Sequence, residues 1–167
     1  MSIPKGLTRI GARAFSGCRK LVEIALPDGL NEINDGVFRF CDSLKKLTIP
    51  QSITRIGREA FLGCKSLTEI ILPEELKEIG ERTFMSCYEL SEIEIPIGVV
   101  KIGKDCFCQC RNLRRVTLPV GVNSIDADAF ARCESLEEIL VPAKNTDYYR
   151  KRLPGGLWDK IVEQDQD

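Results

Sequence analysis

The sequence contains no histidine, so it lacks the side chain that most often acts as a general base near neutral pH and the commonest zinc ligand. Aromatic residues make up only 7% of the chain, with one tryptophan, although sugar sites and tight protein contacts favour such side chains. No apolar run approaches the roughly 20 residues that a membrane helix needs. The segment Met1-Ser2-Ile3-Pro4 has no signal-peptide pattern. We therefore expect no membrane insertion.

An excess of charge of one sign is also missing, because 24 basic residues face 25 acidic ones and leave a net charge of -1. Nucleic acids select clustered lysine and arginine, so we expect no nucleic-acid partner. The sequence has no phosphate-binding glycine loop, and no serine or cysteine nucleophile stands beside a base. We therefore expect the protein not to be an enzyme, with no catalytic residue and no cofactor.

Most of the 167 residues form an internal repeat with a period of 23 residues. Seven of the eight prolines keep this spacing, and so do columns of phenylalanine, cysteine, leucine and isoleucine. Such periodicity is typical of a solenoid, in which each repeat buries its apolar side chains against its neighbours. Three of the columns are Pro4, Pro27, Pro50, Pro73, Pro96, Pro119 and Pro142; Phe15, Phe38, Phe61, Phe84, Phe107 and Phe130; and Cys18, Cys41, Cys64, Cys87, Cys110 and Cys133.

Written as one unit, the repeat is C-x-x-L-x-x-I-x-L-P-x-x-L-x-x-I-G-x-x-A-F-x-x, and it resembles the leucine-rich repeats of the BspA-like family, also called the treponemal class. The resemblance covers about residues 3–142. It implies a right-handed α/β-type leucine-rich repeat solenoid, with a concave parallel β-sheet and short helical or 3-10 turns on the convex side. We expect six repeats of 23 residues over 1–142, the N-terminal one truncated, and a C-terminal cap over 143–167.

The columns predict the path of each coil. In the segment 67–72, Ile70 and Leu72 alternate inward on a strand that Pro73 ends, because proline donates no ladder hydrogen bond. One later column contains only glycine, asparagine and aspartate. This composition predicts a left-handed corner with positive φ. Asn34 and Asp126 are the most informative positions, because glycine is absent there. One short helical turn should follow it on the convex side. That column is Gly11, Asn34, Gly57, Gly80, Gly103 and Asp126.

The C-terminal residues break the period and predict a cap. A helix should begin at Asn145 or Thr146, carry basic residues in its last turn and end before Pro154. The apolar side chains that follow it should close the last coil, and we interpret Trp158 as a capping residue. These side chains are Leu157, Trp158, Ile161 and Val162.

The N-terminal end shows no comparable cap. The chain enters at Ile3-Pro4, the end of a strand in a truncated repeat. This predicts that the sequence is the C-terminal part of a longer protein. It also predicts weak self-association through the uncapped N-terminal edge.

The eight cysteines raise the question of disulfides and metals. Six of them recur once per repeat, so their side chains should run parallel into the core as free thiols. The cluster Cys106-Phe107-Cys108-Gln109-Cys110 lacks zinc-ligand spacing, and we expect no metal site. Cys108 falls in an exposed column and should be accessible. Unpaired thiols fit either a reducing compartment or the exterior of an anaerobe.

Charged columns alternate in sign along the solenoid, and opposite charges on neighbouring strands stabilise their pairing. One such column is Arg9, Glu32, Arg55, Glu78, Lys101 and Ser124. On the concave face the alternation fails once, where Glu69 neighbours Glu92. These charges serve either to set the register of the coils or to form a recognition pattern for a charged protein.

The resemblance implies a protein-interaction module of a bacterial or protist protein that is cell-surface or secreted in its full-length form, with a host or extracellular-matrix protein as partner. Outward concave residues vary between repeats while the core columns do not, so the concave sheet is the expected contact surface. The alternatives are a structural stalk of a longer surface protein and an intracellular adaptor. The candidate partner-binding residues are Lys45, Lys46, Ile71, Glu94, Arg114, Arg115 and Leu140.

Overall fold

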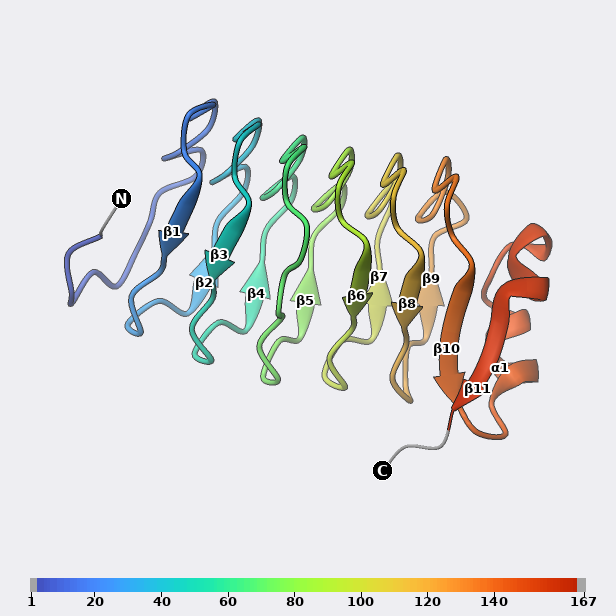
Figure 1. Cartoon of the computed structure of the whole chain (residues 1–167). Coiled ribbons are helices and arrows are strands. Elements are labelled where there is room, and N and C mark those ends of the chain that lie inside the picture. The colour runs from blue at the N-terminus through green and yellow to red at the C-terminus, as the bar shows by residue number, and fades with distance from the viewer. Residues whose placement is uncertain (1–2, 165–167) are drawn as a thin grey trace.

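The computed structural model describes residues 3–164, which form a solenoid of stacked coils (Figure 1). Parallel strands pair at a register of 23 residues, as Ile24 opposite Leu47 and Ile93 opposite Val116 show. The concave strands are β1 (Glu23–Ala25), β3 (Lys46–Thr48), β6 (Glu92–Glu94), β8 (Arg115–Thr117), β10 (Glu138–Pro142) and β11 (Ile161–Gln164). A second strip comprises β2 (Glu32–Ile33), β4 (Arg55–Ile56), β5 (Glu78–Ile79), β7 (Lys101–Ile102) and β9 (Ser124–Ile125). The repeat solenoid expected from the sequence is confirmed.

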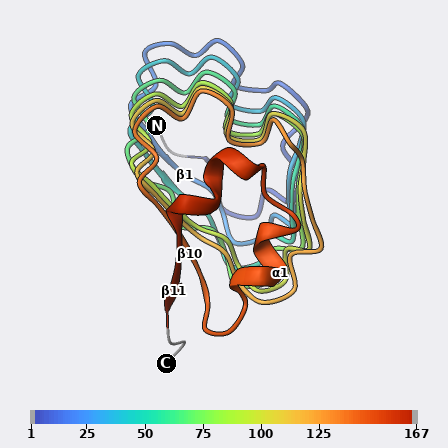
Figure 2. The same cartoon turned by 90° about the vertical axis from the view of Figure 1, so that its right-hand side faces the viewer.

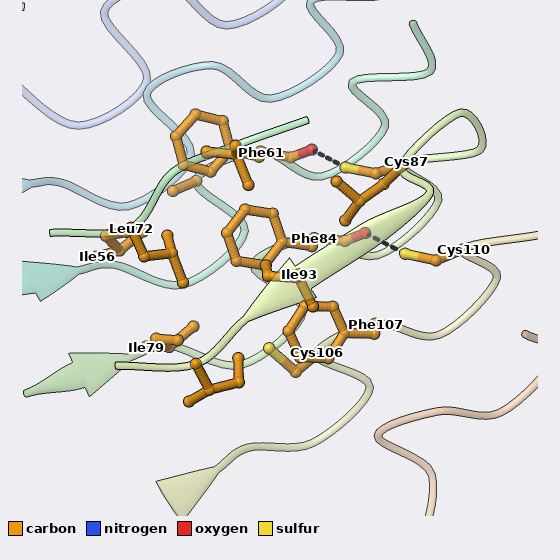
Figure 3. Close-up of a cluster of buried hydrophobic side chains, with 14 of the residues drawn as sticks. Ile56, Phe61, Leu72, Ile79, Phe84, Cys87, Ile93, Cys106, Phe107 and Cys110 are labelled. Atoms are coloured by element: carbon orange, nitrogen blue, oxygen red, sulfur yellow. Dashed lines mark hydrogen bonds between the residues drawn. The ribbon is translucent and has the colours of Figure 1, made fainter. Parts of the chain in front are cut away.

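Phenylalanine and cysteine columns form the centre of the core. Neighbouring phenylalanine rings stack nearly parallel, with centroids 5.4 Å apart from Phe61 to Phe84 and from Phe84 to Phe107. Cys87 donates a hydrogen bond to the Phe61 carbonyl at 3.3 Å, and Cys110 donates one to the Phe84 carbonyl at 3.1 Å (Figure 3). Each thiol thus donates a hydrogen bond to a backbone carbonyl of the preceding coil. An apolar side chain of the same size would leave this carbonyl without that donor.

The convex side consists of successive tight turns. Their hydrogen bonds have the three-residue spacing of a 3-10 helix, for example from the Leu62 amide to the Glu59 carbonyl at 3.2 Å. Other amides on this side bond to the next coil, as the Phe61 amide does to the Thr83 carbonyl at 2.9 Å. Left-handed residues such as Glu59, at φ 56°, interrupt the helical path between turns. The convex side therefore stays a chain of turns.

The predicted left-handed corner at Asn34 and Asp126 is wrong, because neither residue has positive φ. The left-handed positions lie two residues after this column, at Gly36 and Arg82, and in a later column that includes Gly63. Glycine is favoured in the predicted column for a different reason. A Cβ atom on Gly80 would lie 2.4 Å from the Arg58 amide nitrogen of the preceding coil. At Gly57 and Gly80 the coils therefore approach too closely for a side chain, whereas Gly103 has no contact closer than 3.6 Å.

The C-terminal cap contains α1 (Thr146–Arg150), the 3-10 helix Gly155–Lys160, and β11, which pairs in parallel with β10. Figure 2 shows the helices lying across the end of the last coil. The expected helix and strand are confirmed. Trp158 and Val162 remain 47% and 41% exposed, so covering the last coil falls to other residues, including the half-buried Leu157 and Ile161.

Tyr149 is the capping residue that sequence reasoning missed. Its side chain is fully buried, and its hydroxyl donates to the Pro119 carbonyl. Burial raises the pKa of this hydroxyl to about 12. Tyr148 next to it donates to the Val122 carbonyl at 3.1 Å. The two tyrosines thereby fasten the cap to the turn of the preceding coil.

Candidate functional site

The concave sheet is interrupted in the coil of residues 64–86. The segment 69–71, which was predicted to be a strand, pairs with neither β3 nor β6, and Figure 1 shows the coil between these strands without an arrow. Its side chains nevertheless alternate as predicted, since Ile70 is buried and Ile71 is 80% exposed. The prediction of which side chains face inward was therefore right, while the prediction of a paired strand was wrong.

Missing backbone hydrogen bonds mark this interruption. The Leu26 amide donates to the Thr48 carbonyl at 3.1 Å, and the Ile95 amide donates to the Thr117 carbonyl at 2.9 Å. Among the described residues, the equivalent carbonyls of Ile71 and Glu94 accept no backbone hydrogen bond. Over the same residues, the facing amides of Ile49 and Leu72 donate no backbone hydrogen bond either, so donors and acceptors are unpaired together at the interruption.

The second strip opens at a neighbouring point. Strand β5 pairs with β4, and β7 pairs with β9, but β5 and β7 are not hydrogen-bonded to each other. A Cβ atom on Gly103 would have its nearest contact at 3.6 Å, compared with 2.4 Å for Gly80. Coil 64–86 and coil 87–109 are therefore less closely packed at Gly103 than the coils at Gly80. They stay close elsewhere on the strand side, since a Cβ atom on Gly98 would lie 2.6 Å from the Leu76 carbonyl oxygen. We call the missing strand pairing between these two coils the sheet gap.

On the convex side these coils stay in contact. The Phe84 amide donates to the Cys106 carbonyl at 2.9 Å, and the Phe84 and Phe107 rings stack at 5.4 Å. The sheet gap is thus confined to the strand ladders and does not extend to the convex side. The one pair of like charges in the concave column, Glu69 beside Glu92, falls at the sheet gap and opposes strand pairing there.

A recess of about 480 Å³ lies over the sheet gap, and we call it the concave hollow. Of the candidate partner-binding residues, the structure brings Ile71, Glu94 and Arg115 together in its lining. Other lining residues, among them Glu74 and Pro96, were not candidates, and no local sequence signal identifies them. The full lining is Gln51, Glu69, Ile70, Ile71, Leu72, Glu74, Glu92, Ile93, Glu94, Pro96, Arg115 and Thr117.

The remaining candidates lie outside the concave hollow. Lys46 lies on β3 beside Glu23 of β1, and Lys45 precedes it as an exposed residue. Arg114 is exposed and directly precedes β8. Leu140 on β10 is half-buried between Thr117 and Val162. These residues are distributed along the concave face and do not form one patch.

The concave hollow is strongly acidic. Four glutamates line it, against a single basic residue, Arg115. The guanidinium of Arg115 is engaged by Glu138 at 2.9 Å and by Glu92 at 3.6 Å. The hydrogen bond to Glu138 raises the pKa of Arg115, so the group remains cationic. Arg115 therefore neutralises carboxylates of the neighbouring concave strands.

Ion pairs between coils also follow the charged columns elsewhere, as predicted. Arg55 lies 3.4 Å from Glu32 and 3.4 Å from Glu78, on the coils before and after it. Arg19 lies 3.8 Å from Asp42. These pairs are exposed, so each contributes at most about 1 kcal/mol. They favour the correct register and limit free charge on the surface.

The cysteines are all free thiols, and their accessibility differs from the prediction. Cys108 is 8% exposed, so its predicted accessibility is wrong. Its turn tucks the side chain against the neighbouring coil, and burial raises the pKa of this thiol. Cys18 is exposed, because no coil stacks on its outer side among the described residues. Burial raises the pKa of Cys106 to about 12.

Alkylation should therefore modify Cys18 far faster than any other thiol. We expect iodoacetamide at pH 8 to label Cys18 within minutes in the native protein, whereas the buried thiols require unfolding because they are inaccessible and protonated. Mass spectrometry of tryptic peptides measures each site. A Cys18→Ser variant is the control and should lose the fast phase. Rapid labelling of Cys108 would contradict the burial described above.

Neither metal sites nor membrane-spanning segments are found in the described part of the chain. Over residues 3–164, no three acidic or cysteine side chains are placed to hold a metal ion. Within the same residues, no helix has both the length and the apolar character needed to cross a membrane.

A family profile described as BspA type Leucine rich repeat region matches residues 1–87 and 31–152, in six copies. A leucine-rich repeat protein from Bacteroides ovatus has a similar crystal structure, with 31% identity and a TM-score of 0.67 over 84% of this chain and 46% of that chain. The T. pallidum leucine-rich repeat protein is 26% identical, with a TM-score of 0.64 over 90% and 81% of the two chains.

The pneumococcal vaccine antigen PcpA shares the fold at 21% identity, with a TM-score of 0.82 over 99% of this chain and 41% of that chain. The present chain thus spans less than half the length of the Bacteroides ovatus protein and of the pneumococcal antigen. Comparison with curated protein sequences gives no match.

Proposed function

Because the chain belongs to the BspA type leucine-rich repeat family, we propose that it is a protein-interaction module of a cell-surface or secreted protein. It presents its concave face to a host or extracellular-matrix protein. The observation that carries this proposal is the concave hollow, an open recess that leaves Ile71 80% exposed. Ile97, which follows the lining residue Pro96, is 66% exposed. Accessible apolar side chains beside a recess on a rigid scaffold favour contact with another protein.

The expected affinity is weak, micromolar or poorer. No aromatic side chain lines the concave hollow. Exposed charged contacts contribute about 0–1 kcal/mol each, which a few such contacts cannot raise to nanomolar affinity. Binding should also weaken as the salt concentration rises, because exposed charge interactions are screened.

Reversing charge on the concave face should change this binding. The change is Arg114→Glu together with Arg115→Glu, measured by surface plasmon resonance against a panel of purified host extracellular-matrix proteins. We expect the affinity for any protein that the unmodified chain binds to change about tenfold, because the charge of the contact surface is reversed at two positions.

The matched control for that variant carries Lys104→Glu and Arg132→Glu, two exposed basic residues on the convex turns. It changes the net charge equally and should bind as the unmodified chain does. Circular dichroism verifies folding of both variants. Unchanged binding by the concave variant, or equal losses in both variants, would move the contact away from the concave face.

A structural segment of a longer surface protein is the second candidate, and the ion pairs between coils favour it because they join charged residues of neighbouring repeats to one another. Weak self-association through the N-terminal edge remains a further proposal, and Phe15 lies only half-buried at that end. Failure of the folded, unmodified chain to bind any protein of the panel would favour the structural candidate.

A further inference from the structure

We propose that the concave hollow binds the side chain of an arginine carried by an extended, basic segment of a partner protein. This inference rests on the proposed function and names the chemistry of the partner. It follows from the charge and the shape of one location. Each of these features is independent of the family comparison.

The negative charge of the concave hollow favours a cationic ligand. Glu69, Glu74 and Glu94 line the concave hollow and form no ion pair with any described residue. The fourth carboxylate, Glu92, lies 3.6 Å from Arg115. The guanidinium of Arg115 is shared with Glu138, so it leaves the three unpaired carboxylates uncompensated. A basic partner segment is therefore attracted and an acidic one is repelled.

The spread of these carboxylates selects an extended cation over a metal ion. In the described part of the chain, no three acidic side chains converge closely enough to hold a metal ion. A recess of about 480 Å³ falls in the size range of small-ligand pockets, about 300–1,000 Å³. A long side chain fits this recess, since its aliphatic stem can pack against Ile71 and Pro96 while its charged end reaches the carboxylates.

The spread of the carboxylates favours arginine over lysine. Glu69 and Glu74 belong to coil 64–86, whereas Glu92 and Glu94 belong to coil 87–109. Arginine carries five N–H donors in a planar fork, and it can bind several carboxylate oxygens together. Lysine offers three donors on one atom and matches such a spread of acceptors less well.

The test uses defined peptides and two matched variants. The probe is a nine-residue peptide, acetylated and amidated, in which three arginines alternate with valine and serine. Its counterparts carry lysine or glutamine in place of arginine. The variant Glu69→Gln, Glu74→Gln, Glu94→Gln removes three charges from the concave hollow. Its control, Glu75→Gln, Glu81→Gln, Glu134→Gln, removes three exposed charges that lie outside the lining.

Isothermal titration calorimetry at low salt measures the peptide affinities. We expect the arginine peptide to bind the unmodified chain more tightly than the lysine peptide, and the glutamine peptide not to bind. The hollow variant should lose about tenfold in affinity for the arginine peptide, and the control variant less than about twofold. Equal losses in both variants, or an unchanged affinity in the hollow variant, would overturn the proposal. Displacement of the peptide by micromolar Ca²⁺ would overturn it in favour of a metal site.

These outcomes separate this inference from the proposed function. Peptide binding that depends on the three glutamates, without binding to any matrix protein, would support the arginine site and reject the matrix partner. Matrix-protein binding that is lost in the Arg114 and Arg115 variant but retained in the hollow variant would support the proposed function and reject the arginine site.

Discussion

Replacing Phe84 by alanine is expected to lower the free energy of unfolding by about 3–5 kcal/mol, as large-to-small changes in tightly packed cores do. The Phe84 ring is fully buried and stacks on Phe61 on one side and Phe107 on the other, at 5.4 Å in both directions. Because each coil is stabilised mainly by its neighbours, the cavity weakens two interfaces at once. Urea unfolding followed by circular dichroism measures the change.

Phe15→Ala is the matched control for Phe84→Ala. Phe15 stacks only on Phe38, at 5.5 Å, and its other side is the open end of the column in the described residues. Its loss should cost about half as much or less, because a half-exposed ring gains less from burial. Equal losses at the two positions would show that stacking in the middle of the column adds nothing to stability.

The sequence predicted this core well because periodicity reports directly on burial. Columns that recur every 23 residues placed Phe84 and Cys87 inside, and both are fully buried. The hydrogen bond from Cys87 to the Phe61 carbonyl could not be predicted, because it joins residues 26 positions apart through the geometry of stacking. Periodicity identifies which side chains are buried, while their hydrogen-bond partners depend on how the coils pack.

The left-handed positions were misplaced for a related reason. Glu59 and Arg82 adopt φ values of 56° and 54°, although neither residue type favours them. Their amides donate to the Glu81 and Lys104 carbonyls of the next coil, both at 2.9 Å. Hydrogen bonds between coils thus impose the conformation, and intrinsic preference does not reveal it. The glycine column that does stand out in the sequence marks a close approach of coils at Gly57 and Gly80 instead.

The candidate site was only partly predictable. Alternation along the segment 67–72 identified Ile71 as an outward concave residue. The like charges of Glu69 and Glu92 gave one local signal that pairing is opposed there. The sheet gap depends on the spacing of whole coils. So does the position of Glu74 and Pro96 in the lining of the concave hollow. Such spacing is a property of the assembled solenoid, so no single repeat encodes it.

Gly80→Ala is expected to destabilise the protein by about 1–3 kcal/mol, the usual cost of inserting a group into a close-packed contact. The added Cβ atom would lie 2.4 Å from the Arg58 amide nitrogen and 2.6 Å from the Gly57 carbonyl carbon. Both are backbone atoms, so the contact is relieved only if one coil moves away from the next. That movement would strain the Gly80 amide's hydrogen bond to the Ile56 carbonyl, now at 2.8 Å. Urea unfolding provides the measurement.

Gly103→Ala, the same change in the next repeat, should be neutral or stabilising by up to about 1 kcal/mol. A Cβ atom on Gly103 would have its nearest contact at an ordinary 3.6 Å, from Glu81. Its φ is not positive, so alanine adopts the backbone without strain and reduces the entropy of the unfolded chain. The pair of variants therefore measures how closely the coils pack after β5 and β7. If Gly103→Ala costs as much as Gly80→Ala, the two coils are in close contact at Gly103 in solution, and the looser packing there is wrong.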